Sequence, residues 1–295
     1  MNIMPNPTSM KVVQDSIGTA KKKKDNINSS GIPMWSFLIL YLFTITGIAI
    51  YSQYKLHNVL LHPIHVALSL FLALNLIVCF FEMVLFYKHE KIAEKCREYQ
   101  KILTIPTKDG LAPPSRLSFG LNFFTGLKVN FQNVFSSELW TEVWAYYSVF
   151  DRSYGSTESF GYFIDVGNGF STIVPTVIFL FGMTCHGIGF EELILETFGG
   201  SDGSLVVYHL SSFVSIICEA RTLGIIGFAS FWQEFYGTIV YFLSFIHNKR
   251  HLKLTCMENG IFVCLTNGLW IVFPLVGMFA SWKLIQEGNH EVFVL

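Results

Sequence analysis

Three carboxylate side chains stand inside long apolar stretches of the chain: Glu82, Asp165 and Glu234. A charged group at the centre of a bilayer costs about 3 kcal/mol or more, so each of these residues is a candidate functional residue. A carboxyl group in apolar surroundings can stay protonated and act as an acid, while a second carboxylate acts as a base. The pattern therefore indicates proton-transfer chemistry in an apolar interior.

Two amides and an indole accompany these carboxylates: Asn75, Asn267 and Trp270. Asn75 precedes Glu82 by seven residues, which is two helical turns, so both side chains face roughly the same way. An indole face can stabilise a cation. The plainer interpretations are a carboxylate near the membrane surface for Glu82, a helix-start residue for Asp165, interhelical hydrogen bonding for Asn267 and packing for Trp270.

The composition places these residues in a membrane protein. Of the 295 residues, 52% are hydrophobic and only 14% are charged, whereas soluble domains carry about 25% charged residues. The mean hydropathy is +0.46. The net charge of -1 gives no field that would attract a polyanion, so a nucleic-acid partner is not expected.

Five apolar stretches are long enough to cross a bilayer as helices. The sequence predicts an all-α, polytopic bundle with transmembrane helices at about 34–52, 64–87, 160–183, 222–246 and 260–283. Residues 1–31 form a polar tail expected to be disordered, residues 32–285 the membrane bundle, and residues 286–295 a short second tail. A further apolar stretch at 205–219 is too short and is predicted to be a re-entrant or interfacial helix.

The distribution of Lys and Arg sets the expected orientation. The first tail, the 88–159 segment and the 247–259 loop are basic, whereas the 184–204 loop has no Lys or Arg. Because basic loops stay in the cytosol, five spans with a cytosolic N-terminus are predicted. At about 1.5 Å per residue, Glu82, Asp165, Asn267 and Trp270 then lie roughly 5–15 Å from the cytosolic face, and Glu234 about 18 Å from it. Their common depth predicts one shared cavity.

The cytosolic 88–159 segment is expected to contain two structured parts. Residues 88–103 predict a helix that extends the second span, and 109–116 predict a break after it. The aromatic-rich residues 117–135 are expected to lie along the membrane surface.

Several other site chemistries find no support. No metal site is expected, because no metal-binding motif or comparable cluster of His and carboxylate residues occurs. The six cysteines lack CxxC spacing and are interpreted as apolar thiols. No GxSxG motif occurs, which argues against a serine hydrolase. A transporter is disfavoured because neither an inverted repeat nor a pair of broken helices is evident.

Three blocks of the sequence resemble the emopamil-binding protein family, the membrane sterol Δ8–Δ7 isomerases of the EXPERA group. They are SELWTEVWAYYSVFDRSYGSTESFGYFID (137–165), FWQEFYGTIVYFLSF (231–245) and LTNGLWIVFPLVGMFASWKLI (265–285). The first is similar to the family's LWKEY and D-x-R-Y pattern, the second to its Q-x-YG-x-x-x-YFL pattern, and the third to its MNxLWxxxP pattern. The EXPERA-like part thus covers about 137–285.

The resemblance implies roles for particular residues. It assigns Glu82 and Asp165 as the catalytic carboxyls and implies substrate-binding roles for Glu234, Tyr236, Asn267 and Trp270, which lie in the blocks. Asn75 is added to the predicted substrate-binding residues because it faces the same way as Glu82. It implies a sterol or terpenoid lipid substrate, no cofactor, and the endoplasmic reticulum membrane, and it leaves a homodimer open. One family position differs, since Val78 stands where the isomerases carry a His.

The predicted function is therefore an isomerase-like enzyme that moves a double bond in a sterol or related terpenoid by protonation and deprotonation through a carbocation. Two alternatives remain open, because Val78 leaves the family's proton-handling pair incomplete. The first is a membrane terpenoid cyclase that uses the same acid chemistry. The second is a non-catalytic protein that binds a sterol or another lipid.

Overall fold

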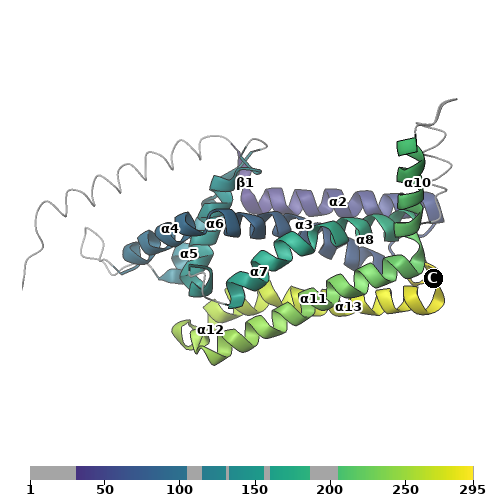
Figure 1. Cartoon of the computed structure of the whole chain (residues 1–295). Helices are drawn as coiled ribbons and strands as arrows, with labels where there is room; N and C mark the ends of the chain where they lie inside the picture. The colour runs from purple at the N-terminus through teal and green to yellow at the C-terminus, as the bar shows by residue number, and fades with distance from the viewer. Residues whose placement is uncertain (1–30, 105–114, 131–132, 156–159, 187–204, 295) are drawn as a thin grey trace, which may run out of the picture.

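The computed structural model describes residues 31–104, 115–130, 133–155, 160–186 and 205–294. Its main helices lie roughly lengthwise in one bundle (Figure 1). They are α2 (Met34–His57), α3 (Pro63–Tyr87), α7 (Phe160–Ser171), α8 (Ile173–Cys185), α11 (Ala220–His247) and α13 (Thr266–Glu287). Asn58 in the left-handed conformation ends α2, and Pro63 in the first turn of α3 starts the next helix. The all-α class predicted from the sequence is confirmed.

Three described helices are long and apolar enough to cross a membrane, or up to five if each of two bent pairs is one span. The three are α2, α3 and the continuous helical stretch Cys256–Glu287, and the pairs are α7–α8 and the end of α10 (Leu205–Cys218) with α11. The predicted five spans agree with the upper end of this range. The exact number remains a prediction.

The predicted third span is not one straight helix. Its two parts, α7 and α8, are bent by 49° at Thr172. The Thr172 hydroxyl donates to the Asn168 carbonyl four residues earlier, and such bonding to the preceding turn often bends helices. A pair of helices broken within one apolar stretch is therefore present, contrary to the sequence-based expectation.

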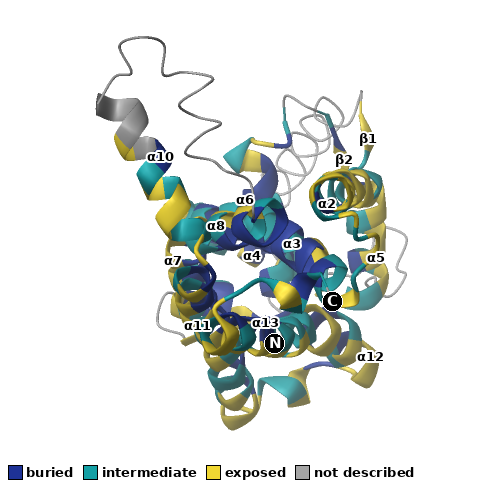
Figure 2. Ribbon diagram, turned by 90° about the vertical axis from the view of Figure 1, so that its right-hand side faces the viewer, coloured by how far each residue is buried: buried dark blue, intermediate teal, exposed yellow. Residues whose placement is uncertain are grey.

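The exposed side of α2 is that of a helix that faces lipid. Its buried positions include Thr46 and Gln53, whereas Leu40 and Phe43 are 61% and 75% exposed. A soluble helix would place these residues the other way round. By contrast, 11 of the 25 residues of α3 are buried, and this helix lies at the centre of the bundle (Figure 2). These features support an integral membrane protein.

One end of the bundle carries a group of shorter elements, which we call the α4 end (Figure 1). They are α4 (His89–Ile102), α5 (Arg116–Gly126), α6 (Ser137–Phe150), α12 (Cys256–Glu258), the 3-10 helices Arg152–Gly155 and Arg250–Lys253, the π-helix Asn259–Leu265, and the paired strands β1 (Ile32–Pro33) and β2 (Lys128–Val129). The predicted helix at 88–103 corresponds to α4. Most of the predicted break at 109–116 lies outside the described residues.

The aromatic stretch 117–135 is only partly the surface segment expected from the sequence. Its helix α5 packs against α6, where the Phe123 ring stacks on Tyr146 with centroids 4.4 Å apart. Leu121 and Phe135 are 47% and 66% exposed. The amphipathic sequence thus covers an aromatic core with one face and leaves the other exposed.

At the opposite end, α10 stands across the long axis of the bundle (Figure 1), and its last turns make an angle of 69° with α11. A third 3-10 helix, η4 (Glu291–Phe293), follows α13 at this end. Phe213 and Ile216 on α10 are 56% and 60% exposed. A separate short helix at 205–219 was predicted, and its re-entrant or interfacial position remains a prediction.

Candidate functional site

Asn75 connects four helices through its side-chain amide. Its Nδ2 atom donates to Glu234 Oε1 on α11 at 2.7 Å and to Thr176 Oγ1 on α8 at 2.9 Å. Its Oδ1 atom accepts from the indole Nε1 of Trp270 on α13 at 3.2 Å. Asn75 itself is 1% exposed. One amide on α3 therefore sets the positions of a carboxyl group and an indole ring inside the bundle.

Glu82 lies two turns further along α3, on the same buried side as Asn75. Its carboxyl group is close enough to those of Asp165 on α7 and Glu234 on α11 for negative charges on them to repel one another. The close approach of α7 depends on Gly169, because an added Cβ there would lie 2.8 Å from the Cβ of Glu82. Glu82, Asp165 and Glu234 form what we call the carboxyl cluster.

The carboxyl cluster has no basic partner in the described part of the chain. The ion pairs there join other residues. Glu82 Oε2 and Glu234 Oε2 are buried and accept no hydrogen bond from any described residue. Buried polar atoms nearly always have a partner, so each of these two oxygens is available to a proton on the carboxyl group itself, to an ordered water or to a polar group of a ligand.

Asp165 is half-buried and faces three tyrosines, which we call the tyrosine cluster: Tyr147, Tyr154 and Tyr241. The Tyr154 ring centroid is 5.4 Å from that of Tyr147 and 6.4 Å from that of Tyr241. The Tyr154 hydroxyl lies near Asp165 without a hydrogen bond of ordinary geometry. Among the described residues, the polar neighbours of Asp165 thus include phenol hydroxyls and the carboxyl groups of Glu82 and Asp151, and no cation.

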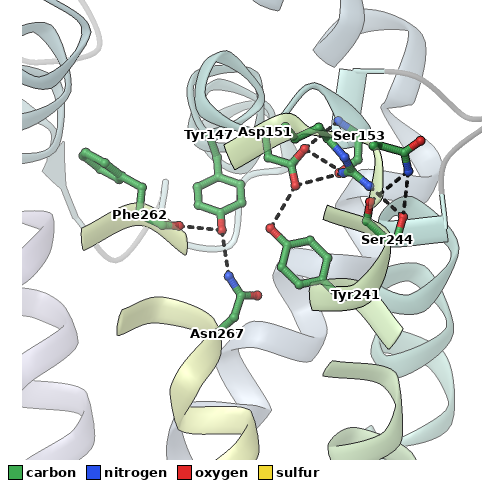
Figure 3. A network of polar contacts seen from close by, with 9 residues as sticks. Tyr147, Asp151, Ser153, Tyr241, Ser244, Phe262 and Asn267 are labelled. Carbon is green, nitrogen blue, oxygen red and sulfur yellow. Dashed lines mark hydrogen bonds and ion pairs between the residues drawn. The ribbon is translucent and has the colours of Figure 1, made fainter. Parts of the chain in front are cut away.

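Asp151 holds the tyrosine cluster in place (Figure 3). Its carboxylate accepts from Tyr241 at 2.8 Å and from Arg250 Nη1 at 2.9 Å. The backbone N–H of Ser153 adds a third donor at 2.9 Å. Asp151 is fully buried and Arg250 nearly so, so this ion pair joins the end of α6 to the end of α11.

Asn267 bonds to the tyrosine cluster and, among the described residues, has no hydrogen bond to Asn75 or to the partners of Asn75. Its Nδ2 atom donates to the Tyr147 hydroxyl at 3.2 Å and to the Val263 carbonyl at 2.9 Å (Figure 3). The preceding π-helix, Asn259–Leu265, leads into α13 just before this residue. Such π-helical turns often occur at functional sites.

Tyr236 does not join either cluster. It is 55% exposed and stacks on Trp232 along the outer side of α11. Two residues along a helix correspond to about 200° of rotation, so Tyr236 faces away when Glu234 faces inward. The structure therefore places six of the seven predicted site residues in the interior and Tyr236 outside it.

Several residues at the site were not predicted from the sequence: Tyr147, Asp151, Tyr154, Thr176, Tyr241 and Arg250. Four of them stand in the blocks that carry the family resemblance, at 137–165 and 231–245, and their polar groups within those blocks could have marked them. Thr176 had no such signal, because a Thr in a transmembrane helix commonly bonds its own backbone. The described residues include no group of three or more His, Cys, Asp or Glu side chains able to hold a metal ion.

Comparison with known proteins adds no relative. No family model, no curated protein and no solved structure matches the chain. The resemblance to the emopamil-binding protein family therefore remains a prediction from the sequence blocks. The features of the structure that bear on function are the carboxyl cluster and the hydrogen bonds of Asn75 to Glu234 and Trp270.

Proposed function

We propose that the protein is a membrane isomerase-like enzyme that shifts a double bond in a sterol or related terpenoid. The observation that carries the proposal is the pair of unpartnered buried oxygens, Glu82 Oε2 and Glu234 Oε2. Acid–base chemistry on a hydrocarbon requires carboxyl groups that face an apolar substrate and are not neutralised by cations. The carboxyl cluster meets this requirement.

The reaction needs one proton delivered and one removed. A protonated carboxyl adds its proton to one carbon of the double bond, which leaves a carbocation on the other carbon. A second carboxylate removes a proton from the next carbon, and the double bond forms in its new position without net consumption of protons. Asp165 and Glu82 are proposed as this pair, because they lie on facing helices within electrostatic range.

Trp270 and Asn75 are proposed to position the cation. The indole N–H is bonded to Asn75, and the Trp270 ring meets Phe71 edge to face at 5.9 Å. A ring held in this way offers its π face to a positive charge at little entropic cost. Glu234, held by the same amide, is proposed to contact the substrate.

The proposed location is the endoplasmic reticulum membrane, with the α4 end in the cytosol. Basic residues concentrate at that end of the described bundle: Lys88, Lys91, Lys95, Arg97, Lys101, Arg116, Lys128, Arg152, Lys249, Arg250 and Lys253. Loops with such an excess of Lys and Arg remain cytosolic.

Val78 favours two other uses of the same residues, since it removes the histidine of the sterol isomerases. A terpenoid cyclase would protonate a polyprenyl olefin or epoxide with one carboxyl group and deprotonate the cyclised cation with another. A lipid-binding protein would use the carboxyl cluster to hold the polar group of a sterol. The first alternative forms a cyclic product, and the second forms no product.

The test measures product formation by purified protein in native lipid, with a Δ8 sterol and with polyprenyl substrates. Asp165→Asn and Glu82→Gln should each lower turnover by roughly 10²–10⁴, the range for a positioned acid or base. Glu94→Gln, an exposed carboxylate on α4, is the matched control and should leave turnover unchanged. Conversion by neither wild type nor control, or wild-type turnover in both variants, would overturn the catalytic proposal.

A further inference from the structure

Five of the nine histidines gather at the end of the bundle opposite to α4, which we call the histidine end. They are His57 at the end of α2, His62 just before α3, His65 in the first turn of α3, His186 after α8 and His290 after α13. None of them takes part in the proposed chemistry. Their grouping brings together segments that are far apart in the sequence.

Three of these imidazole rings form a parallel stack. The His57 and His186 centroids are 3.9 Å apart with an interplanar angle of 8°, and His186 and His290 are 4.4 Å apart with the same angle. In a parallel stack the ring nitrogens cannot converge on one ion, which agrees with the absence of a metal-binding group among the described residues. Neutral rings can pack in this way, whereas neighbouring imidazolium ions repel each other.

The stack holds the segment that follows α13 against the bundle. Gly288, with a φ of 68°, ends the helix and turns the chain back. The short helix η4 then places Phe293 in the interior, where it is 0% exposed. Gln53 on α2 donates its Nε2 hydrogen to the Phe293 carbonyl. His290 in the stack and Phe293 in the core are thus the two anchors of residues 288–294.

Phe293 closes a column of aromatic rings that leads to the site. Its ring centroid is 6.3 Å from that of Phe179 on α8, which is 5.0 Å from Phe231 on α11. Phe231 is 6.4 Å from Phe71, and Phe71 is 5.9 Å from Trp270. Removal of Phe293 would open the histidine end of this apolar column.

We propose that residues 288–294 form an acid-released plug, which leaves the histidine end of the aromatic column when the stacked histidines take up protons. The plug does not depend on the chemistry proposed for the carboxyl cluster, because its release is set by the charge on the histidine stack. Its trigger is the charge on the stack, and its moving part is the segment that carries His290 and Phe293.

The surroundings of the stack favour the neutral rings. Burial and the neighbouring imidazoles His290, His57 and His65 lower the pKa of His186 to about 3. The pKa of His290 is also lowered, first by burial, although the Glu219 carboxylate opposes this effect. The other titratable or charged side chains described at this end are Tyr54, Lys55, His62, Cys185, His209, Cys218, Arg221, Lys283, Glu287 and Glu291.

The sign of the pH effect follows from the difference in pKa between the docked and the released imidazole. A docked ring stays neutral, whereas a released imidazole regains a pKa near 6.5, so the released state binds more protons as the pH falls below that value. For each histidine whose docked form stays neutral, the release equilibrium should rise by about 30-fold between pH 7.5 and 5.0. The plug is therefore docked at neutral pH and leaves at acidic pH.

The test uses the full-length protein in lipid nanodiscs and brief exposure to hydroxyl radicals at pH 7.5 and 5.0. Oxidation of Phe293, measured by mass spectrometry, should increase several-fold at pH 5.0. Phe150, which is 4% exposed near the α4 end, is the internal reference and should not change. Equal oxidation of Phe293 at the two pH values would overturn the proposal.

Variants separate the histidine stack from a general effect of acid. His290→Gln cannot gain a charge and should lose most of the increase. His89→Gln, which changes a half-buried histidine at the start of α4, should keep it. A full acid response in His290→Gln would contradict the proposal. If that variant exposes Phe293 already at pH 7.5, His57→Gln decides: a reduced acid response supports the stack as the trigger, and an unchanged one refutes it.

Discussion

Replacement of Asn75 by Leu tests the central contact of the site. The two side chains have the same number of heavy atoms and the same branching at Cγ, so the change removes hydrogen bonds without opening a cavity. The three bonds of Asn75 to Thr176, Glu234 and Trp270 would be lost. Glu234 would then have no described partner at either oxygen, because its other oxygen already lacks one.

The expected loss in the free energy of unfolding depends on the value assigned to one buried hydrogen bond. At about 0.6 kcal/mol each, the average for membrane proteins, three bonds give about 2 kcal/mol. At about 1–1.5 kcal/mol each, as in soluble proteins, they give about 3–5 kcal/mol. We expect a loss of about 2–4 kcal/mol, since the stranded Glu234 carboxyl adds to the membrane value.

The assay is reversible unfolding of Asn75→Leu in mixed detergent micelles, followed by circular dichroism. Asn248→Leu is the control, because Asn248 is exposed at the end of α11 and bonds only within its own turn. It should change the free energy of unfolding by less than about 0.5 kcal/mol. If Asn75→Leu destabilised the protein no more than this control, the four-helix junction at Asn75 would be wrong.

Three further predictions concern the rest of the fold and the site. Asp151→Ala should cost about 3–5 kcal/mol of unfolding free energy, because it leaves a buried arginine unpaired, whereas Glu287→Ala in an exposed pair should cost about 1 kcal/mol or less; equal losses would refute the difference. A membrane-impermeant thiol reagent should label Cys256 only from the cytosolic side, and labelling of Cys185 from that side would refute the proposed orientation. A sterol-like amine should bind at least about tenfold more tightly than its neutral carbon isostere, as expected for a carbocation mimic, and equal affinities would argue against the carboxyl cluster as its site.

The helices that cross the bundle could largely be predicted, because their signal is local. An apolar run of about 20 residues needs no partner to become a helix in a bilayer, and α2, α3 and α13 follow such runs. The bend at Thr172 could not be predicted in the same way. It depends on whether one hydroxyl bonds the preceding turn, which the composition of the run does not show.

Position along a span could be predicted for the site residues, but the rotation of each helix could not. The depth of Glu82, Asp165 and Trp270 in the bilayer stays a prediction, while the structure shows Glu82 buried and the other two partly buried. Rotation depends on how the helices pack. Asn267 and Trp270 are three residues apart on α13, yet one bonds Tyr147 and the other Asn75. The outward direction of the Tyr236 side chain could not be predicted for a similar reason, because the resemblance selects the residue and not the side of the helix on which it lies.

The measurement that tests the central claim most directly is deuterium incorporation. Wild-type protein in native lipid is incubated in deuterium oxide with a Δ8 sterol, and the sterols are analysed by mass spectrometry. Proton transfer by the carboxyl cluster predicts a shifted double bond and one deuterium bound to ring carbon, both absent in Asp165→Asn. A sterol that is bound but recovered with neither change, while polyprenyl substrates also remain unconverted, would contradict the claim and leave a lipid-binding protein.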